Sequence, residues 1–348
     1  MTKVTAIGLF SGGLDSISAC RVIMEQSIQV IALKFVTPFF DDHLLSREEE
    51  YQAEVQEKFG IDVRLVDLSE GYIDLLRNPK HGYGKHFNPC IDCKIFMLTR
   101  ARELMETYGA SFLFTGEVLG QRPMSQRRDT LRVIERDSGC EDILLRPLCA
   151  KLMNETLPER EGLVDRERLY AFSGRGRKQQ MKLADHFGIT EYPNPAGGCI
   201  LTDPNLGARI EQFYEEKLQT SSKELRAGDI RLLLVGRQFR LPDGHWVVLG
   251  RDQAENDRIL SLAEQSDAIV KMTQRPGPTG LIRRVGKDVV SALNSHATIV
   301  QAAGLVVHYG RKIDGQALPA EVMVSLDNET VTLNAEPVAI QESADWKL

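Results

Sequence analysis

Short apolar runs alternate with segments of helical periodicity through the N-terminal part of the sequence. The runs VTAIGLF, QVIALKFV, VRLVDL and SFLFTG are rich in Val, Ile, Leu and Phe, as strands covered on both faces should be. Helical periodicity lies between them at residues 16–26, 46–59 and 95–108, and Gly60 and Gly109 follow the last two segments, a usual end for a helix. This alternation predicts an α/β fold with a doubly wound parallel sheet.

The pattern changes after a mostly polar helical segment that begins near residue 206. Beyond it, RLLLVG, HWVVLG, AIVKM, GLIRR and GLVVHYG are predicted to be strands, and residues 252–264 and 287–303 to be helices. A chain of 348 residues is long enough for more than one core. We therefore expect a catalytic α/β domain at residues 1–205, a helical linker at 206–225 and a smaller α+β domain at 226–340.

The charge is spread unevenly along the chain. The net charge of −6 argues against a protein that coats RNA non-specifically. Residues 226–312 nevertheless hold 13 Lys and Arg against 8 Asp and Glu, whereas residues 313–348 hold one Lys against 7 acidic residues. A solvated surface and a local contact with a phosphate backbone both account for the basic segment. No run is apolar enough to span a bilayer and the N-terminus lacks a signal-peptide pattern, so we expect a cytoplasmic protein with no membrane contact.

The hexapeptide Ser11-Gly12-Gly13-Leu14-Asp15-Ser16 separates the first predicted strand from the first predicted helix. Two glycines allow the backbone to turn tightly and to approach an anion without a Cβ clash. Amides at a helix start, the helix dipole and the two serine hydroxyls favour phosphate oxygens, and Asp15 is expected to help hold Mg²⁺. The motif is neither G-x-x-x-x-G-K-[ST] nor G-x-G-x-x-G. The alternative is a structural turn in which Asp15 only caps the helix.

This hexapeptide resembles the signature of the PP-loop ATP pyrophosphatases. Members of that family have a doubly wound sheet, bind ATP, adenylate a carbonyl oxygen and release pyrophosphate. The resemblance implies that the pyrophosphate is held by Ser11, Gly12, Gly13, Asp15 and Ser16. It further implies that Phe35 lies near adenine and that the nucleotide pocket is completed by Thr115, Gly116 and Glu117, with Gln121 close by.

Three cysteines occupy loop-like sequence. Cys90 and Cys93 lie in NPCIDCK, at the start of a predicted helix, and Cys199 lies in the glycine-rich PAGGCILTD. The helix dipole and Lys94 are expected to lower the thiol pKa of the pair. Three interpretations stay open: a structural zinc site, inert thiols, or a functional site with either an iron–sulfur cluster or a persulfide. The zinc site would need His81 or His86 as its fourth ligand.

On a PP-loop scaffold, NPCIDCK together with GGCILTDP resembles the tRNA thiolation enzymes. These include the 4-thiouridine and 2-thiouridine synthases and their three-cysteine, cluster-dependent relatives. The resemblance implies catalytic roles for Asp15, Cys93 and Cys199, and a 4Fe–4S cluster held by Cys90, Cys93 and Cys199. The remaining cysteines lie in or beside apolar segments and are predicted to belong to the core: Cys20, Cys140 and Cys149.

Two basic regions are candidates for RNA contact. One is the stretch SGRGRK at residues 173–178 with Arg122, Arg127 and Arg128; a solvated surface is the alternative. The other is the C-terminal region, where GRDQAEND, DAIVKM and PGPTG resemble the NFACT-R domain, which is taken to bind RNA. The resemblance implies an RNA-binding domain, and the alternative is a domain that only packs beside the catalytic one.

Taken together, these resemblances imply an ATP-dependent tRNA uridine thiolase. A uracil carbonyl oxygen would be adenylated with ATP and Mg²⁺, and sulfur would then displace AMP. The sequence has no region for sulfur transfer, so an external donor, a cysteine desulfurase or sulfide, is expected, with a homodimer as a candidate assembly. The alternatives are a PP-loop ligase that delivers nitrogen, as in lysidine or amide synthesis, and a non-catalytic, ribosome-associated RNA-binding protein.

Overall fold

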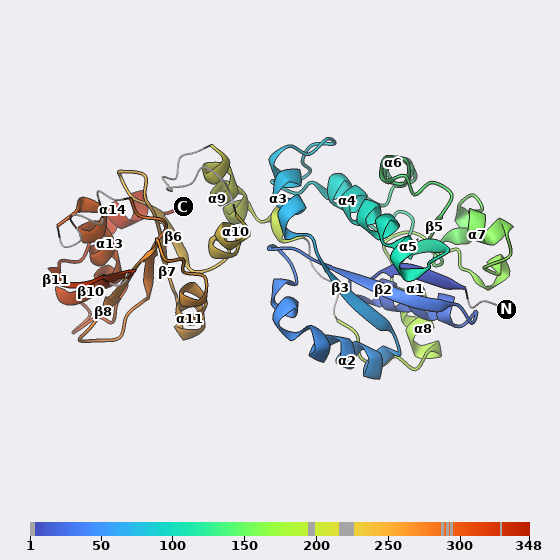
Figure 1. The fold of residues 1–348 in the computed structure, drawn as a ribbon, viewed down its shortest axis with the longest axis horizontal. Coiled ribbons are helices and arrows are strands. Elements are labelled where there is room, and N and C mark those ends of the chain that lie inside the picture. Colours follow the sequence, from blue (N-terminus) through green and yellow to red (C-terminus); the bar gives the residue numbers. More distant parts are fainter. Residues whose placement is uncertain are drawn as a thin grey trace. The chain divides into compact units, whose positions relative to one another are not determined.

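The computed structural model of the chain divides into two compact units, Met1–Thr202 and Asp203–Leu348 (Figure 1). The structure describes residues 4–193, 199–215, 226–286, 289, 292, 295–327 and 329–348. Each unit is described by itself. The division falls close to the expected end of the α/β domain, and the segment expected to link the domains begins with a helix of the second unit, α9 (Pro204–Tyr214).

A five-stranded parallel sheet forms the first unit. Its strands are β1 (Thr5–Leu9), β2 (Gln29–Val36), β3 (Asp62–Asp67), β4 (Phe112–Thr115) and β5 (Leu144–Leu145), in the order β3-β2-β1-β4-β5. All four strand pairs are parallel. The predicted doubly wound α/β fold and its four predicted strands are confirmed.

Helices connect these strands and cover both faces of the sheet (Figure 1). They are α1 (Leu14–Met24), α2 (Glu48–Phe59), α3 (Ser69–Arg77), α4 (Cys90–Glu103), α5 (Met105–Tyr108), α6 (Arg128–Ser138), α7 (Leu157–Arg160) and α8 (Lys178–His186), with short 3₁₀ turns at Asp42–Arg47, Ala150–Leu152, Arg166–Arg168 and Ile200–Thr202. Gly60 and Gly109 end α2 and α5 with φ of 69° and 60°, as predicted from their positions in the sequence.

Two apolar layers result, because successive side chains of a strand point to opposite faces. Ala6 and Phe112 belong to one core with helices α1 and α8. Their neighbours in the chain, Ile7 and Leu113, belong to a second core with α4 and α6. The unbroken apolar character of the strand sequences follows from this double coverage.

The carboxyl ends of β1 and β4 define where a ligand is expected. The chain leaves β1 toward β2 on one side, and β4 joins on the other side, so the strand order reverses between β1 and β4. In open parallel sheets, ligands bind in the crevice at such a switch point. The Ser11–Ser16 turn follows β1, and Gly116 follows β4, so both lie at this edge.

A six-stranded antiparallel sheet forms the second unit, in the order β11-β10-β8-β9-β7-β6. The strands are β6 (Arg237–Arg240), β7 (Trp246–Leu249), β8 (Ala268–Met272), β9 (Gly280–Ile282), β10 (Ala320–Leu326) and β11 (Glu329–Ala335). The helices described here are α9, α10 (Ala227–Leu233), α11 (Gln253–Ser261), α13 (Ala297–His308) and α14 (Ile340–Asp345). Helix α13 packs its apolar residues against the sheet.

Two strand predictions in this unit are wrong. RLLLVG begins inside α10, where the Asp229 side chain accepts a hydrogen bond from the Arg226 amide at 2.9 Å and caps the helix. GLVVHYG lies mostly in α13, because an apolar run that is buried on all sides has no period that separates strand from helix. The helix expected at 287–303 is described only from Ala297, and most of residues 287–294 lie outside the described part of the chain.

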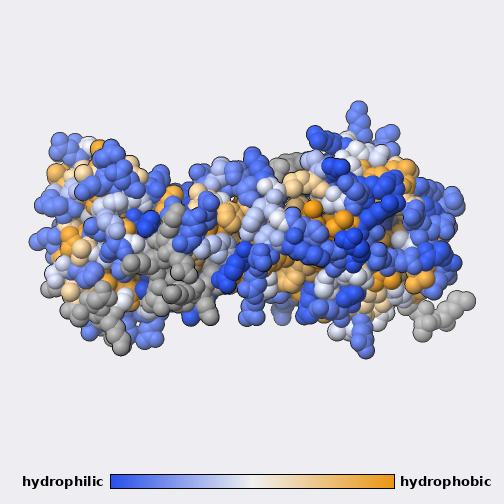
Figure 2. Space-filling view, turned by 90° about the horizontal axis from the view of Figure 1, so that it is seen from above, coloured by the Kyte–Doolittle hydropathy of each residue, from blue (hydrophilic) through white to orange (hydrophobic). Residues whose placement is uncertain are grey.

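The surface that Figure 2 shows is mostly hydrophilic, with apolar side chains in small scattered patches. Within the described residues, no helix combines the length and the hydropathy that a bilayer crossing requires.

Candidate active site

The Ser11–Ser16 turn is held by its own polar groups. Gly12 has a φ of 80°, which favours glycine, and Gly13 precedes the first residue of α1. The Ser16 hydroxyl donates to the Gly13 carbonyl at 2.8 Å, and the Ser11 hydroxyl accepts from the Gly13 amide at 3.3 Å. The two hydroxyl oxygens lie 3.2 Å apart. The turn thus places two hydroxyls and the amides of a helix start in one small region, as phosphate binding requires.

Lys34 supports this turn from the neighbouring strand β2. Its ammonium group is buried, donates to the Ser11 carbonyl at 2.9 Å and pairs with Asp41 at 2.6 Å. Our sequence analysis did not single out this residue. The sequence does contain an indication of its role: Lys34 lies inside the apolar run QVIALKFV, which is predicted to be buried. A buried charge must be paired, so a lysine at such a position indicates a specific partner.

The segment after β4 packs directly on the turn. A Cβ atom at Gly116 would lie 2.4 Å from the carbonyl oxygen of Asp15 and 2.7 Å from the amide nitrogen of Ser16. No side chain fits there, because both neighbours are backbone atoms. Gly116 therefore fixes how closely the end of β4 approaches the start of α1.

Asp15 is held from two sides and keeps one free oxygen. Its Oδ2 accepts from the Gln121 amide at 2.7 Å and lies 3.8 Å from the Arg177 guanidinium. Gln121 is itself bound by the fully buried Gln180 at 3.2 Å. Asp15 Oδ1 is buried and has no hydrogen-bond partner among the described residues. A carboxylate oxygen in this state suits a hard cation such as Mg²⁺.

Arg177 comes from the basic stretch that was a candidate for RNA contact. Its position beside Asp15 directs it toward the turn instead. Of the other arginines in that prediction, Arg128 donates to the Leu152 carbonyl at 2.8 Å and Arg127 pairs with Asp129 at 3.1 Å on the surface.

Glu117 joins the nucleotide side to the cysteine side. Its Oε2 accepts from Thr115 and from Arg146, both at 3.1 Å, and its Oε1 lies 3.3 Å from the Lys94 ammonium group. Burial opposes ionisation of Glu117, but Lys94 and Arg146 outweigh it and lower its pKa to about 2. The carboxylate is therefore charged, and it lies between Gly116 on the turn and Lys94 beside Cys93.

Helix α4 begins at Cys90, and Cys93 lies one turn further on. The Tyr72 hydroxyl donates to Cys93 Sγ at 3.4 Å. Burial, and then the neighbouring Cys93, raise the pKa of Tyr72, with smaller contributions from Cys199 and Cys90. Burial also raises the pKa of Cys93 to about 12, against the smaller opposing effects of Tyr72 and Lys94. The expected lowering of the Cys93 pKa is therefore wrong, because desolvation outweighs the helix start and the lysine.

Cys199 lies near the pair, although its glycine-rich loop at 194–198 lies outside the described residues. Burial raises its pKa, a hydrogen bond from the Leu201 backbone opposes this, and the charges of Cys90 and Arg122 add smaller effects of opposite sign. Cys199 therefore interacts electrostatically with the pair, but the described residues contain no group of three or more His, Cys, Asp or Glu that is ready to hold a metal ion. The sulfur donors suit a soft metal centre in kind.

Other predicted residues are placed clearly. Phe35 is 6% exposed and belongs to a core cluster with residues of α4, and its position near adenine stays a prediction. The cysteines predicted to be core residues are all buried: Cys20, Cys140 and Cys149. The His81 ring lies 2.9 Å from Asp137 through its Nε2 atom.

Two family models match the chain. Residues 1–156 match the thiamine biosynthesis protein (ThiI) family, and residues 236–347 match the NFACT protein RNA binding domain. A comparison with curated proteins found no match.

Several solved structures are similar to the chain at low identity. A 4-thiouridine synthetase in complex with RNA and bound ATP is 20% identical, with a TM-score of 0.34, over 53% of this chain and 52% of that chain. The U34-tRNA thiolase NcsA from Methanococcus maripaludis, with its 4Fe–4S cluster, is 15% identical, with a TM-score of 0.31, over 62% and 72%. A predicted tRNA methyltransferase subunit from Methanocaldococcus jannaschii is 13% identical, with a TM-score of 0.34, over 61% and 89%. The chain thus spans about half the length of the first of these.

The sheet, its switch point and the Ser11–Ser16 turn give the first unit an α/β fold with a candidate phosphate-binding turn. More particularly, the first unit contains the match to the ThiI family, and the second contains the match to the NFACT protein RNA binding domain. Both resemblances seen in the sequence are confirmed at the level of these domains.

Proposed function

We propose that the chain is an ATP-dependent tRNA uridine thiolase. One observation carries the proposal: Gly116 contacts the phosphate turn, and the next residue, Glu117, pairs with Lys94, the neighbour of Cys93. A nucleotide site and a cysteine site therefore meet at one edge of the sheet. An enzyme that first activates a carbonyl oxygen and then delivers sulfur to the same carbon needs this proximity.

The first step is adenylation of a uracil carbonyl oxygen. That oxygen attacks the α-phosphate of ATP, and the bond to the β-phosphate breaks to release pyrophosphate. The turn hydroxyls and amides stabilise the charge of the leaving pyrophosphate, and Arg177 adds a cation beside Asp15. Asp15 Oδ1 is the acceptor available to Mg²⁺, which would neutralise phosphate charge.

Sulfur then replaces AMP at the activated carbon. Cys90, Cys93 and Cys199 would hold a 4Fe–4S cluster, which would supply an electrophilic site for inorganic sulfur. Tyr72 donates to Cys93 and so stabilises negative charge on that sulfur. A persulfide on Cys93 or Cys199 is the alternative carrier: its outer sulfur is transferred from the persulfide of an external cysteine desulfurase, and the other cysteine releases it to the carbon by forming a disulfide. In the cluster route the sulfur also comes from outside the chain, from a cysteine desulfurase or from sulfide, and a homodimer is the candidate assembly.

The second unit is proposed to position the tRNA. Its family match and the basic excess of residues 226–312 support this role. A nitrogen-delivering PP-loop ligase would have no use for three thiols in one neighbourhood, and a purely RNA-binding protein would not need the turn.

A direct assay tests the function. Protein purified without oxygen is incubated with ATP, Mg²⁺, sulfide and tRNA from cells that lack the gene, and nucleosides are then examined by mass spectrometry. Thiouridine formation with stoichiometric pyrophosphate release is expected. Pyrophosphate release with a nitrogen-containing product would establish the ligase instead, and tRNA binding without pyrophosphate would establish the RNA-binding protein.

A further inference from the structure

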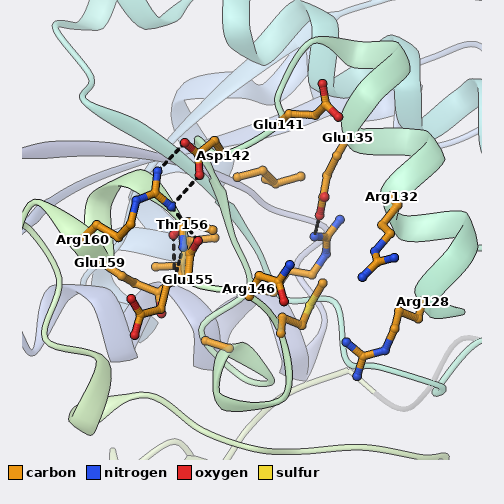
Figure 3. A pocket seen from close by; sticks show the side chains of 15 residues that line it. Arg128, Arg132, Glu135, Glu141, Asp142, Arg146, Glu155, Thr156, Glu159 and Arg160 are labelled. Carbon is orange, nitrogen blue, oxygen red and sulfur yellow. Dashed lines mark hydrogen bonds and ion pairs between the residues drawn. The ribbon is translucent and has the colours of Figure 1, made fainter.

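A cavity lies at the β5 edge of the sheet, where Leu144, Leu145 and Arg146 line it. It has a volume of about 440 Å³ and lies between α6 and the segment 150–160 (Figure 3). This volume is within the range of about 300–1,000 Å³ that is typical of small-ligand sites. The site described above does not use this cavity.

Helix α6 turns one polar face toward the cavity. Arg128, Arg132 and Glu135 are spaced by four and then three residues, which places them on one side of a helix, and all three line the cavity. Figure 3 shows the two arginines on the same wall, with Arg146 beside them. Arg136, one residue beyond Glu135, does not line the cavity and pairs with Asp137 at 2.8 Å.

Arg146 presents an unused donor to this cavity. The residue is 2% exposed, its Nε donates to Glu117 at 3.1 Å and its Nη1 donates to Glu135. Its Nη2 is buried and has no hydrogen-bond partner among the described residues. A buried guanidinium nitrogen without an acceptor is costly, so this group favours a ligand that accepts hydrogen bonds.

The other wall of the cavity has its charges already paired. Arg160 donates to Asp142 at 2.8 Å, and Glu159 accepts from the Thr156 amide at 2.7 Å and pairs with Arg166. In contrast, no interaction of the exposed Arg132 guanidinium with another described residue is found. The donors that remain are cationic: Arg132 on α6, and Arg146 Nη2 directly after β5.

We propose that this cavity binds the phosphate group of a nucleotide, which Arg132 and Arg146 Nη2 contact directly. A guanidinium fork matches phosphate oxygens in geometry and charge. The volume exceeds that of a phosphate alone, so the attached nucleoside occupies the rest. The nucleotide is one unit of the RNA strand, an assignment that rests on the proposed function, and a free nucleoside monophosphate has the same chemistry.

Arg132→Gln and Arg136→Gln form a matched pair that tests the proposal in the full-length protein. Both remove one exposed charge from α6, and neither arginine belongs to the buried network, so both variants are expected to fold. Arg132→Gln should weaken tRNA affinity by about five- to tenfold and should reduce the salt dependence of binding by about one phosphate contact. Arg136→Gln should leave both quantities unchanged.

Titration with uridine monophosphate distinguishes the source of the phosphate. A loss of tRNA affinity without uridine monophosphate binding assigns the cavity to the RNA strand. Binding of uridine monophosphate that Arg132→Gln abolishes, with unchanged tRNA affinity, assigns it to a free nucleotide. Equal behaviour of the two variants toward both ligands would overturn the inference.

The wild-type protein separates this inference from the proposed function. If it forms thiouridine while the two variants behave alike, only the cavity assignment is wrong. If it forms no thiouridine but binds uridine monophosphate through Arg132, the proposed function is wrong and the phosphate site stands.

Discussion

Gly116 and Asp15 touch through backbone atoms, with only 2.4 Å between the Asp15 carbonyl oxygen and the position that a Cβ of residue 116 would take. The contact joins the end of β4 to the start of α1. It therefore sets the shape of the phosphate turn from outside the turn itself. The same strand end continues into Glu117 and reaches Lys94. One short segment thus sets the spacing between the two halves of the proposed site.

The first prediction concerns this contact. Gly116→Ala should reduce ATP affinity at least about tenfold, because the methyl group must push the start of α1 away from the strand. Gly176→Ala is the control, since a Cβ there meets nothing within 4 Å. Equilibrium binding of ATP measures both variants, and circular dichroism checks that they fold. Equal ATP affinity in the two variants would show that the contact does not shape the site.

Asp15→Asn should abolish ATP turnover while leaving the fold intact. The amide keeps the size of the side chain, but it removes the charge that Mg²⁺ needs at Oδ1. We expect a loss of about 100-fold or more in pyrophosphate release, which excess Mg²⁺ does not restore. Asp129→Asn, on the surface of the same unit, is the control. Normal turnover by the Asp15 variant would contradict the PP-loop assignment.

The three cysteines should be required together. Protein purified without oxygen should contain iron and labile sulfide near a four-iron cluster, and replacement of Cys90, Cys93 or Cys199 by Ala should remove both cluster and thiolation. Cys20→Ala, in the buried core, should affect packing only. One zinc and no iron would contradict the cluster. No metal, with a persulfide trapped on Cys93 or Cys199, would support the covalent carrier instead.

Glu117 should make the first unit sensitive to acid. Its pKa is about 4.5 when unfolded and about 2 when folded, so the ionised carboxylate stabilises the fold above about pH 4.5. That contribution, about 3 kcal/mol, is lost as the pH falls through 2. Glu117→Gln should abolish the dependence within this window and destabilise the unit at neutral pH, because Lys94 and Arg146 lose their partner. Hydrogen exchange of the β4 amides at several pH values measures this; an unchanged pH profile in the variant would refute the role.

The second unit should supply affinity for tRNA. Removal of residues 226–348 should weaken tRNA binding and reduce its salt dependence, because the basic segment 226–312 is lost with it. ATP binding should be unchanged, since the phosphate turn lies in the first unit. Unchanged tRNA affinity at matched salt would assign RNA binding to the arginines of the first unit.

The strands of the first unit were predictable because a short, continuous apolar run in the local sequence indicates a buried strand. The run QVIALKFV predicts β2, and β2 covers the same residues. Prediction failed at residues 304–310, most of which belong to helix α13. A segment that is buried on all sides is apolar throughout, so its apolar residues show no spacing that distinguishes a helix from a strand. The hairpin of β10 and β11 was not predicted either.

The site was predictable only in part. The turn residues and the three cysteines are recognisable because their chemistry depends on local sequence, such as glycine at a positive φ. The position of Phe35 near adenine was implied by the family resemblance and stays a prediction; the structure adds that Phe35 packs in the core. Lys34 and Arg177 come from other parts of the chain and contact Ser11 and Asp15 of the turn. These contacts depend on the folded chain and could not be predicted from the sequence.

The sequence by itself determined the order of features along the chain: a glycine-rich turn after the first strand, a cysteine pair at a helix start, and two domains of different pattern. Local propensity and hydrophobic period carry that information. Only the tertiary structure decided the pKa values of the site residues and which distant residues contact one another. Burial raises the pKa of Cys93, although its local sequence favours a thiolate, and two cations lower the pKa of Glu117, although it is buried. Desolvation and charge pairing act through space, so residues far apart in the chain set them.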